Sequence, residues 1–506
     1  MRFANFAFYR SIQSLIFNMM RGIRRTRTRS NKFRMMLNGR GWFIIAILVG
    51  IYLLNMPTPE GLTPLGHRVL VMSIVATILF VTEPIPLPAV ALLMMIGQVF
   101  LLDTQSTDVA KSIMSDSVLF IMGSLMLAVA IVKQKLDKRI AFFIVKMTGT
   151  KTANICVGIS AVSGLMASVV GEHTVAAMML PVAITLIRLT SEDPKQVKSL
   201  AAVLLFSIAY GCSVAGISTP SGGARNAIMI GFWQEFFYDA NDPSTSKYLV
   251  DYISWIMYCF PVFLVQLALT SFIIQKSFKP EYQTLNRSIV KLRQQLEQQG
   301  KMDLSDWTTI AIFFVTLIGW VFFSDTVGLG TIALMGSVAF LIFGLIKWED
   351  INTNVNWGVV ILYGSAISLG IQMKDTGAAT WLANQIVNLL AYIGAEGGVS
   401  LWLTVSALTA GVTNTMSNGA AVAMLGPVTL KMAVVAEESP LLMGYITAIS
   451  SAFAYLTVVG TPACTIVYSS GYLKSSDFLK VGLKMMFMSM TVLILFAYFY
   501  WPLIGL

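Results

Sequence analysis

Two short polar clusters interrupt apolar stretches and carry the side chains best suited to bind a small ion. The first is Gly171-Glu172-His173-Thr174 and the second is Ser417-Asn418-Gly419. Small residues, then Met and Leu, follow each cluster, and a proline lies ten positions after its start, at Pro181 and Pro427. Hydroxyl and amide oxygens can bind a hard cation, whereas O–H and N–H groups can bind an anion. We therefore interpret the two clusters as the halves of one binding site.

The composition defines the class of protein. Of 506 residues, 56% are hydrophobic and only 12% are charged, and the mean hydropathy is +0.73. A soluble chain carries roughly twice that share of charge, and repeated apolar runs of about 18 or more residues predict membrane-spanning helices. We expect an all-α polytopic membrane protein. The net charge of +10 lies in a few loops, as orientation signals do, so it does not indicate a nucleic-acid partner.

Cysteine and histidine usage indicates neither a disulfide framework nor a histidine-rich metal centre. The four cysteines lie in or beside apolar segments without paired spacing, and the chain has only two histidines. Buried cysteines usually serve as small packing residues.

Residues 1–40 form a basic segment with many arginines, no acidic residue, and interleaved aromatic and aliphatic residues. This pattern predicts an amphipathic segment on the cytoplasmic surface, bound to anionic membrane lipid. An organellar presequence has a similar composition and is the alternative.

The first transmembrane repeat is predicted over 41–275. Four spans, at about 42–56, 66–82, 87–102 and 117–132, precede a basic stretch, and the positive-inside rule then assigns that stretch to the cytoplasm. The segment 153–190 has two apolar arms, which are short for two full crossings with a loop between them. Basic residues follow the segment. We expect a re-entrant hairpin with its tip at Gly171–Thr174. A helix at about 199–216 is broken at Gly216–Asn226, and a span at 252–275 returns to the cytoplasm.

A polar linker at 276–305, expected to be a cytoplasmic surface helix, leads to the second repeat over 306–506. Its predicted parts are spans near 307–323, 329–346 and 357–373, an amphipathic external segment at 376–396, a hairpin at 398–435, a helix broken at 459–464, and a last span at 479–503. Gly123-Ser124 also echoes Gly364-Ser365. We predict about 11 transmembrane helices in two inverted repeats, each with a re-entrant hairpin and a broken helix.

The hairpin tips and helix breaks bring half-helix ends together. N-terminal ends attract a carboxylate or sulfate, and unwound carbonyls suit Na⁺. Thr461-Pro462 would face the second tip from the broken helix. A capped turn is the simpler explanation of Ser417-Asn418-Gly419 alone, but the matching first hairpin favours a binding site.

These motifs resemble the divalent anion/sodium symporters, the DASS family, over nearly the whole chain after residue 40. Thr82–Pro88 resembles the start of that family's third helix. The family's two Ser-Asn-Thr tips correspond to Gly171-Glu172-His173 and Ser417-Asn418-Gly419. Its Thr-Pro-Pro-Asn breaks correspond to Gly223–Asn226 and Thr461–Cys464.

The resemblance implies two sodium sites beside one substrate site. The second sodium site would use Thr413, Met416, Asn418 and Gly460. The first would use Gly171, Glu172 and Gly216, and here Gly and Glu replace the family's Ser and Asn. The predicted substrate-binding residues are Glu172, His173, Thr174, Arg225, Asn226, Ser417, Asn418, Gly419, Thr461 and Pro462.

Glu172 is the main departure from the family pattern. Its carboxylate would repel a dianion unless it were protonated, bound to a cation or paired. His173 and Arg225 are available partners, and Arg225 could also bind substrate directly. An ionisable residue in a membrane segment is a functional candidate. A purely structural Glu172–Arg225 ion pair and a structural buried His173 are the alternatives.

We therefore expect a secondary active transporter of small divalent anions such as C4-dicarboxylates, which couples their transport to Na⁺ by symport. We place it in a bacterial inner (plasma) membrane, with the N-terminus cytoplasmic and the C-terminus external. Proton-coupled transport or cation-independent anion exchange using Glu172, His173 and Arg225 is the alternative. The resemblance implies an elevator mechanism and a homodimer. An enzyme is disfavoured because the chain has no His-Glu-x-x-His or Gly-x-Ser-x-Gly motif, and a channel is disfavoured by two opposed hairpins. We expect no catalytic residues and no cofactor, with Na⁺ as the coupling ion.

Overall fold

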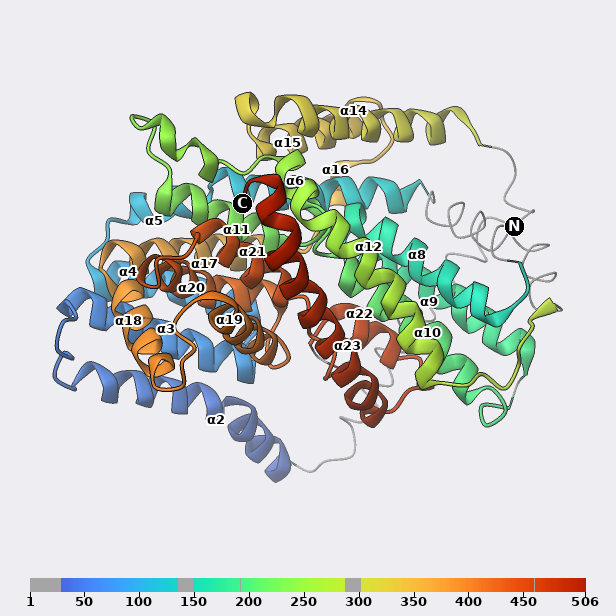
Figure 1. Ribbon diagram of the computed structural model, residues 1–506, viewed down its shortest axis with the longest axis horizontal. Helices are drawn as coiled ribbons and strands as arrows, with labels where there is room; N and C mark the ends of the chain where they lie inside the picture. Colours follow the sequence, from blue (N-terminus) through green and yellow to red (C-terminus); the bar gives the residue numbers. More distant parts are fainter. Residues whose placement is uncertain (1–28, 135–148, 192, 287–301, 459) are drawn as a thin grey trace.

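The computed structural model describes residues 29–134, 149–191, 193–286, 302–458 and 460–506, and these ranges contain helices and no β-strand (Figure 1). The predicted all-α class is confirmed. The helices of the first half are α2 (Arg29–Leu54), α3 (Pro64–Thr82), α4 (Leu87–Leu102), α5 (Ser106–Ile113), α6 (Asp116–Lys133), α8 (Thr152–Val170), α9 (Glu172–Thr190), α10 (Lys198–Ala215), η1 (Pro220–Gly222), α11 (Ala224–Phe237), η2 (Pro243–Tyr248) and α12 (Tyr252–Ser277).

The second half is also helical within the described ranges. Its helices are α14 (Leu304–Val327), α15 (Leu329–Ile342), α16 (Trp348–Asn354), α17 (Trp357–Asp375), α18 (Ala378–Ala391), α19 (Gly398–Thr413), α20 (Asn418–Val435), α21 (Pro440–Ser450), α22 (Pro462–Tyr468), α23 (Ser475–Leu495), η3 (Phe496–Tyr500) and η4 (Trp501–Ile504).

Nine helices in the described ranges are long and apolar enough to cross a membrane, or ten if the bent pair α16–α17 forms one span. The sequence predicted about eleven. The two counts cover different segments. The nine include α8, α9 and α20, which were predicted as hairpin arms, whereas the predicted spans at 42–56, 87–102 and 329–346 form apolar helices of only 14 to 16 residues, namely Gly41–Leu54 within α2, α4 and α15. At 1.5 Å per residue, such helices reach only about 21–24 Å, less than the hydrocarbon thickness.

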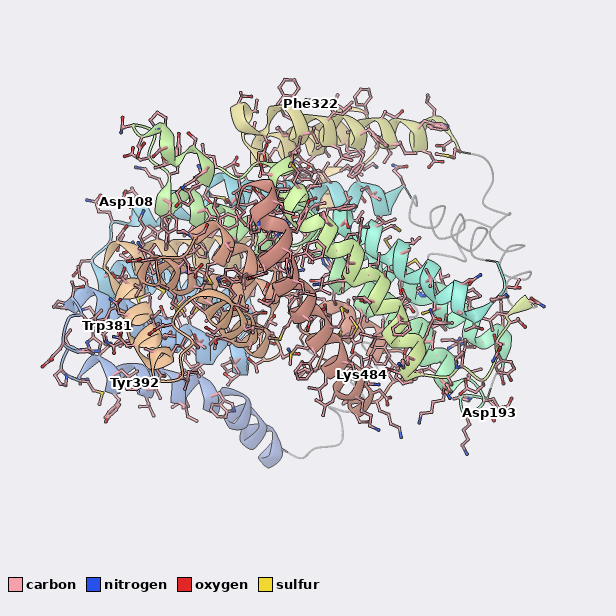
Figure 2. The ribbon with its side chains drawn as sticks, in the orientation of Figure 1. Asp108, Asp193, Phe322, Trp381, Tyr392 and Lys484 are labelled. Atoms are coloured by element: carbon pink, nitrogen blue, oxygen red, sulfur yellow. The ribbon has the colours of Figure 1, made fainter. Side chains whose placement is uncertain are left out.

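The most enclosed helix is α10, in which every residue from Leu200 to Ala215 is buried. A helix that is apolar on all sides belongs in an interior, and α8, α9, α12 and α22 pack around it. By contrast, α14 lies at the edge of the molecule and exposes Phe314, Ile318 and Phe322; the last projects outward in Figure 2. An apolar helix with an exposed apolar face is suited to lipid contact.

The start of α10 is held by a carboxylate from the segment after α12. The two side-chain oxygens of Glu281 accept hydrogen bonds from the backbone N–H groups of Ser199, at 2.8 Å, and Leu200, at 2.9 Å. A carboxylate at a helix N-terminus satisfies unpaired N–H groups and complements the helix dipole. Partial burial raises the pKa of Glu281, but these hydrogen bonds lower it more, so its pKa lies below the ordinary value.

Two segments share one order of elements: two helices joined at a tip, then a helix, a break and a short helix. The first runs from α8 through α11 and the second from α19 through α22. The first break, from Gly216 to Gly223, lies where the sequence predicted it. The second starts earlier than predicted, because α21 ends at Ser450 and α22 begins at Pro462. The opposite orientation of the two repeats remains a prediction.

The arms of the first hairpin are longer than the sequence indicated. Each of α8 and α9 has 19 residues, and only Gly171 separates them. The re-entrant course of this hairpin stays a prediction, because each arm alone satisfies the length and hydropathy of a membrane span.

The predicted amphipathic segment at 376–396 forms α18, which buries Ala379, Ala383 and Val387; Tyr392, which follows its last residue, is exposed (Figure 2). The predictions for residues 1–28, for most of the basic loop after α6 and for residues 287–301 of the linker lie outside the described residues. The first part of the linker is not the predicted helix: residues 278–285 are not helical, and the N–H of Leu285 donates to the carbonyl oxygen of Thr150 at 2.8 Å.

Candidate functional site

The first tip is a sharp joint between α8 and α9. Gly171 has a φ of 91°, a conformation that side-chain-bearing residues rarely adopt. Glu172 is therefore the first residue of α9, where a carboxylate is favoured by the positive end of the helix dipole. The glycine thus directs Glu172 toward the helix break that follows α10.

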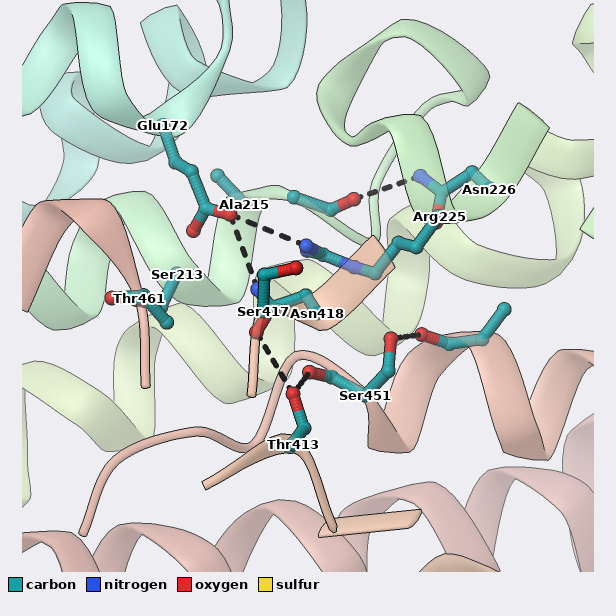
Figure 3. A network of polar contacts seen from close by, with 12 residues as sticks. Glu172, Ser213, Ala215, Arg225, Asn226, Thr413, Ser417, Asn418, Ser451 and Thr461 are labelled. Carbon is teal, nitrogen blue, oxygen red and sulfur yellow. Dashed lines mark hydrogen bonds and ion pairs between the residues drawn. The ribbon is translucent and has the colours of Figure 1, made fainter. Parts of the chain in front are cut away.

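Glu172 connects three elements that are far apart in the sequence (Figure 3). Its Oε1 accepts a hydrogen bond from Arg225 Nη1 of α11 at 3.3 Å and one from Asn418 Nδ2 of α20 at 3.2 Å. Its other oxygen, Oε2, is buried without a partner among the described residues. The carboxylate that would repel a dianion is therefore paired, one of the conditions identified from the sequence.

The Glu172–Arg225 pair is buried. The exposed fraction of the side chain is 2% for Arg225 and 11% for Glu172. Two of the guanidinium nitrogens of Arg225, Nε and Nη2, have no hydrogen-bond partner among the described residues. A buried guanidinium with free donors is suited to bind a carboxylate, because Arg can present two parallel N–H groups to it.

Two glycines of the first break make room for the guanidinium. A Cβ added to Gly216 would lie 1.9 Å from Arg225 Nη2, and one added to Gly223 would lie 3.0 Å from Arg225 Cζ. Asn226 braces the same break, since its Nδ2 donates to the carbonyl oxygens of Gly216, at 2.8 Å, and Thr219, at 2.7 Å. The break is thus a packed structure shaped around Arg225.

The second tip combines a helix cap with a polar chain that continues from Glu172. Ser417 caps α20 by accepting a hydrogen bond from the N–H of Ala420 at 3.4 Å, as the simpler explanation from the sequence required. Asn418 Oδ1 accepts from Thr413 Oγ1 at 2.9 Å, and this hydroxyl also lies 2.7 Å from the carbonyl oxygen of Ser451 (Figure 3). The cap and the contact with Glu172 therefore coexist.

The second tip is also tied to the second break. Asn414 Nδ2 donates to the carbonyl oxygen of Phe453 at 3.0 Å, and Asn414 Oδ1 accepts from the N–H of Leu456 at 2.8 Å. Thr461 caps the following helix by accepting from the N–H of Cys464 at 3.2 Å. These bonds fix the unwound backbone beside Thr413.

The two candidate cation sites differ in their donor atoms. Near Thr413, the hydroxyl, the Asn418 amide oxygen and the Ser451 carbonyl form an all-oxygen group, and such ligands suit a hard cation such as Na⁺. Near Gly216, the guanidinium of Arg225 already supplies a fixed positive charge. The residues present therefore fit a cation at the second site better than at the first.

Both tips border one central cavity of about 260 Å³. The predicted site residues on its wall are Gly171, Glu172, His173, Arg225, Ser417, Asn418, Gly419 and Pro462. Thr174 lines a neighbouring cavity instead. The remaining predicted residues are buried and do not line the central cavity: Thr413, Met416, Gly216, Asn226, Gly460 and Thr461.

Sequence reasoning missed four polar residues on the cavity wall: Ser124 of α6, Ser221 of η1, Asn356 just before α17, and Tyr363 in α17. The ring of Tyr363 packs on the second tip, since a Cβ added to Gly419 would lie 2.1 Å from its Cε1. Ser124 Oγ is buried without a partner among the described residues. The repeated Gly-Ser pairs were the available signal only in part: Ser124 of the first pair reaches the cavity wall, but the glycines of the two pairs mark close packing of α6 on Ala333 of α15 and of α17 on Ile113 of α5.

A family model described as the sodium:sulfate symporter transmembrane region matches residues 40–506. Three relatives are similar over most of their length. The sodium-dependent dicarboxylate transporter SdcS of Staphylococcus saprophyticus is 25% identical over 488 residues, 91% of each chain. An uncharacterized transporter of Haemophilus influenzae is 26% identical over 475 residues, 91% of this chain and 96% of the relative. SdcS of Staphylococcus aureus is 24% identical over 478 residues, 88% of each chain.

Two solved transporter structures have a similar fold. The YdaH transporter of Alcanivorax borkumensis aligns with a TM-score of 0.50 at 11% identity, over 85% of this chain and 99% of that one. MtrF of Neisseria gonorrhoeae aligns with a TM-score of 0.52 at 12% identity, over 79% of this chain and 85% of that one. At such low identity the likeness concerns the fold alone.

Proposed function

This chain belongs to the sodium:sulfate symporter family, the divalent anion/sodium symporters, and from that membership we propose that it carries C4-dicarboxylates across the membrane together with Na⁺. It is an integral membrane transporter and not an enzyme. The Staphylococcus relatives are named as sodium-dependent dicarboxylate transporters, which supports this choice of substrate and coupling ion.

The observation that carries the proposal is the chain of polar contacts from Arg225 through Glu172 and Asn418 to Thr413, beside the central cavity (Figure 3). It links guanidinium donors at one end with an all-oxygen group at the other. A dianion and a cation need opposite ligands, and this arrangement offers both within one continuous network.

Substrate binding in this proposal depends on the free donors of the cavity wall. Arg225 lies on the cavity wall, and its buried, unpaired Nε and Nη2 would have to turn from Gly216 toward the cavity to donate to a substrate carboxylate. Ser417 and His173 would supply further donors from the two tips. Glu172 positions the guanidinium and neutralises its charge while the cavity holds no anion. Asn226 and Thr461 act indirectly, by bracing the two breaks.

Cation binding in this proposal uses the second site. Thr413, Asn418 and the backbone carbonyls near Met416 and Gly460 would surround Na⁺. Because Asn418 donates to Glu172 through Nδ2 and faces Thr413 through Oδ1, an ion bound beside Thr413 would orient the amide that borders the substrate cavity. This shared side chain is the physical link between ion and substrate in the proposed symport.

The wider setting of the proposal is an elevator-type alternating-access mechanism in a homodimer, within the lipid of a bacterial plasma membrane, with a cytoplasmic N-terminus and an external C-terminus. The predicted inverted relation of the two repeats supports this, because inverted repeats with a site between them are the usual basis of alternating access.

Uptake of labelled succinate into proteoliposomes tests the proposal. The three conditions are an inward Na⁺ gradient, no gradient, and succinate preloaded inside. We expect stimulation by the Na⁺ gradient, and sulfate and citrate as competitors would define the range of anions. Uptake that is indifferent to Na⁺ would refute sodium coupling.

A second candidate function, proton-coupled transport or cation-independent anion exchange, is favoured by one observation: the guanidinium of Arg225 occupies the space beside Gly216. A tethered cation there could take the part of a coupling ion, with Glu172 and His173 handling a proton or balancing charge. Uptake stimulated only by internal succinate would support exchange, and uptake driven by a pH gradient without Na⁺ would support proton coupling.

A further inference from the structure

Three cavities follow the length of α6, from one end of the helix to the other. Asp116 and Ser117 at its start line a cavity of about 380 Å³, here the start cavity. Phe120 to Leu125 line the central cavity, and Leu125 to Lys133 line a cavity of about 250 Å³, here the end cavity. The helix has 18 residues, so it spans about 27 Å, close to the thickness of the hydrocarbon core.

The central cavity shares lining residues with only one of its two neighbours. Leu125, His173 and Asn356 line both the central and the end cavity. Among the described residues, none lines both the central and the start cavity. The end cavity thus adjoins the central cavity on the side of Lys133, and His173 and Asn356 stand at the boundary between the two, here the neck.

The two outer cavities carry opposite charge. Three acidic residues and one lysine line the start cavity: Asp108, Asp116, Glu235 and Lys111. In the end cavity Lys133 is the only charged residue among the described lining residues. A dianion is thus repelled by the lining of the start cavity and attracted by that of the end cavity.

Lys133 has an acidic partner and an exposed side. Its Nζ lies 2.6 Å from Asp350 Oδ1, and 53% of its side chain is exposed. The side chain of Asp350 is only 17% exposed, but the ammonium group of Lys133 has three donors, so an incoming carboxylate can reach Lys133 from its exposed side and share its charge with Asp350. Asp350 does not itself line the cavity, which leaves the cation as the group that an anion meets there.

The neck supplies hydrogen-bond donors that are not in use. The side chains of His173 and Asn356 make no hydrogen bond to another described residue. Asn356 lies just before α17, a helix of 19 residues, whose positive end faces the neck. Lys133, Asn356 and His173 therefore form a series of donors that leads from the end cavity to the central cavity.

We propose that the end cavity is a second anion-binding position, which a dicarboxylate occupies between the central cavity and the aqueous phase. Lys133 binds one carboxylate there, and Asn356 and His173 receive it at the neck. This inference rests on the proposed function for the identity of the substrate, but the preference for anions follows from the lining of the cavity alone.

A transport test compares Lys133→Gln and Asp350→Asn. The control is Lys111→Gln: Lys111 lines the start cavity and, like Lys133, has an aspartate partner. With succinate supplied from the Lys133 side, Lys133→Gln raises KM about fivefold, the effect of losing roughly 1 kcal/mol of an exposed charge contact. Asp350→Asn lowers KM, because it frees Lys133. Lys133→Arg keeps KM near that of the wild type, and the Na⁺ concentration for half-maximal activation stays constant.

The opposite signs separate binding from folding. If Lys133 and Asp350 served only to hold α6 against α16, both variants would shift KM in the same direction and lower stability together. That result, an unchanged KM in Lys133→Gln, or an equal change in Lys111→Gln would overturn the proposal.

A second measurement does not depend on transport. All four native cysteines are buried, so a cysteine introduced as Val132→Cys in the end cavity, or as Gln234→Cys in the start cavity, is the accessible thiol. We expect a negatively charged thiosulfonate to react faster than a positively charged one at position 132, with the reverse preference at 234. Adding Lys133→Gln should abolish the preference at 132, and adding Asp350→Asn should strengthen it.

The two measurements fail independently. A charge preference at 132 without uptake of succinate or sulfate would refute the proposed function and leave the anion position standing. Uptake driven by Na⁺ without a charge preference at 132 would overturn the anion position and leave the proposed function standing.

Discussion

Breaking the Glu172–Arg225 pair should destabilise the protein strongly, and breaking both sides at once should not. The two charges are 3.3 Å apart, which corresponds to an attraction of about 5 kcal/mol at an effective dielectric constant of about 20. Removing one partner of a buried pair typically costs about 3–5 kcal/mol, because the other charge is left unpaired. Both side chains are nearly inaccessible, so we expect Glu172→Gln and Arg225→Gln each to fall in that range.

Glu172→Gln isolates the charge, because its amide oxygen can still accept from Arg225 Nη1 and Asn418 Nδ2. The double variant removes both charges and should recover most of the loss. Thermal denaturation of the purified protein in detergent, with insertion into the membrane as a control for expression, measures these differences. Single variants as stable as the wild type, or a double variant whose loss is the sum of the two, would refute the reasoning.

Transport by the same variants decides whether the pair is only structural. We expect Glu172→Gln to change the pH or Na⁺ dependence of uptake, and the double variant to stay inactive although it is stable, because Arg225 is a proposed substrate ligand. A stable double variant with wild-type uptake and an unchanged profile would make the pair structural.

Three further predictions concern the positions around the site. Asn418→Ala should abolish uptake without preventing membrane insertion, because it disconnects the two tips; full uptake would remove the proposed site. Gly216→Ala should impair uptake by about tenfold or more, since a Cβ there would lie 1.9 Å from the guanidinium. Gly411→Ala is the matched control and should be neutral, because no atom lies within 4 Å of its added Cβ. Glu281→Gln should lower the melting temperature at pH 7 but not under acid conditions. The reason is that the pKa of Glu281 is lowered in the folded protein. The stabilisation by its carboxylate is therefore present above the ordinary glutamate pKa of about 4.3 and is lost as the pH falls through the lowered value. An equal difference at both pH values would contradict this.

The positions of many elements could be predicted because their signals are local. The predicted span 87–102 is α4, and the first break, from Gly216, lies where glycine and proline cluster. The second break was only partly predicted: residues 451–458 carry no such cluster, yet their backbone is held unwound by Asn414, which donates to the carbonyl oxygen of Phe453 and accepts from the N–H of Leu456. A tertiary contact there outweighs the local helix propensity.

By itself the sequence determined the class of protein, the two tips and the candidate residues, because apolar run length and polar interruptions are properties of neighbouring residues. The tertiary structure alone decided which of those residues meet. Glu172 reaches Arg225 across 53 positions and Asn418 across 246, while Asn226 and Thr461 turn away to brace the breaks. Tyr363 and Asn356 became cavity residues only when α17 packed against the tips. Contacts at such separation depend on how whole helices pack, and no local pattern records that arrangement.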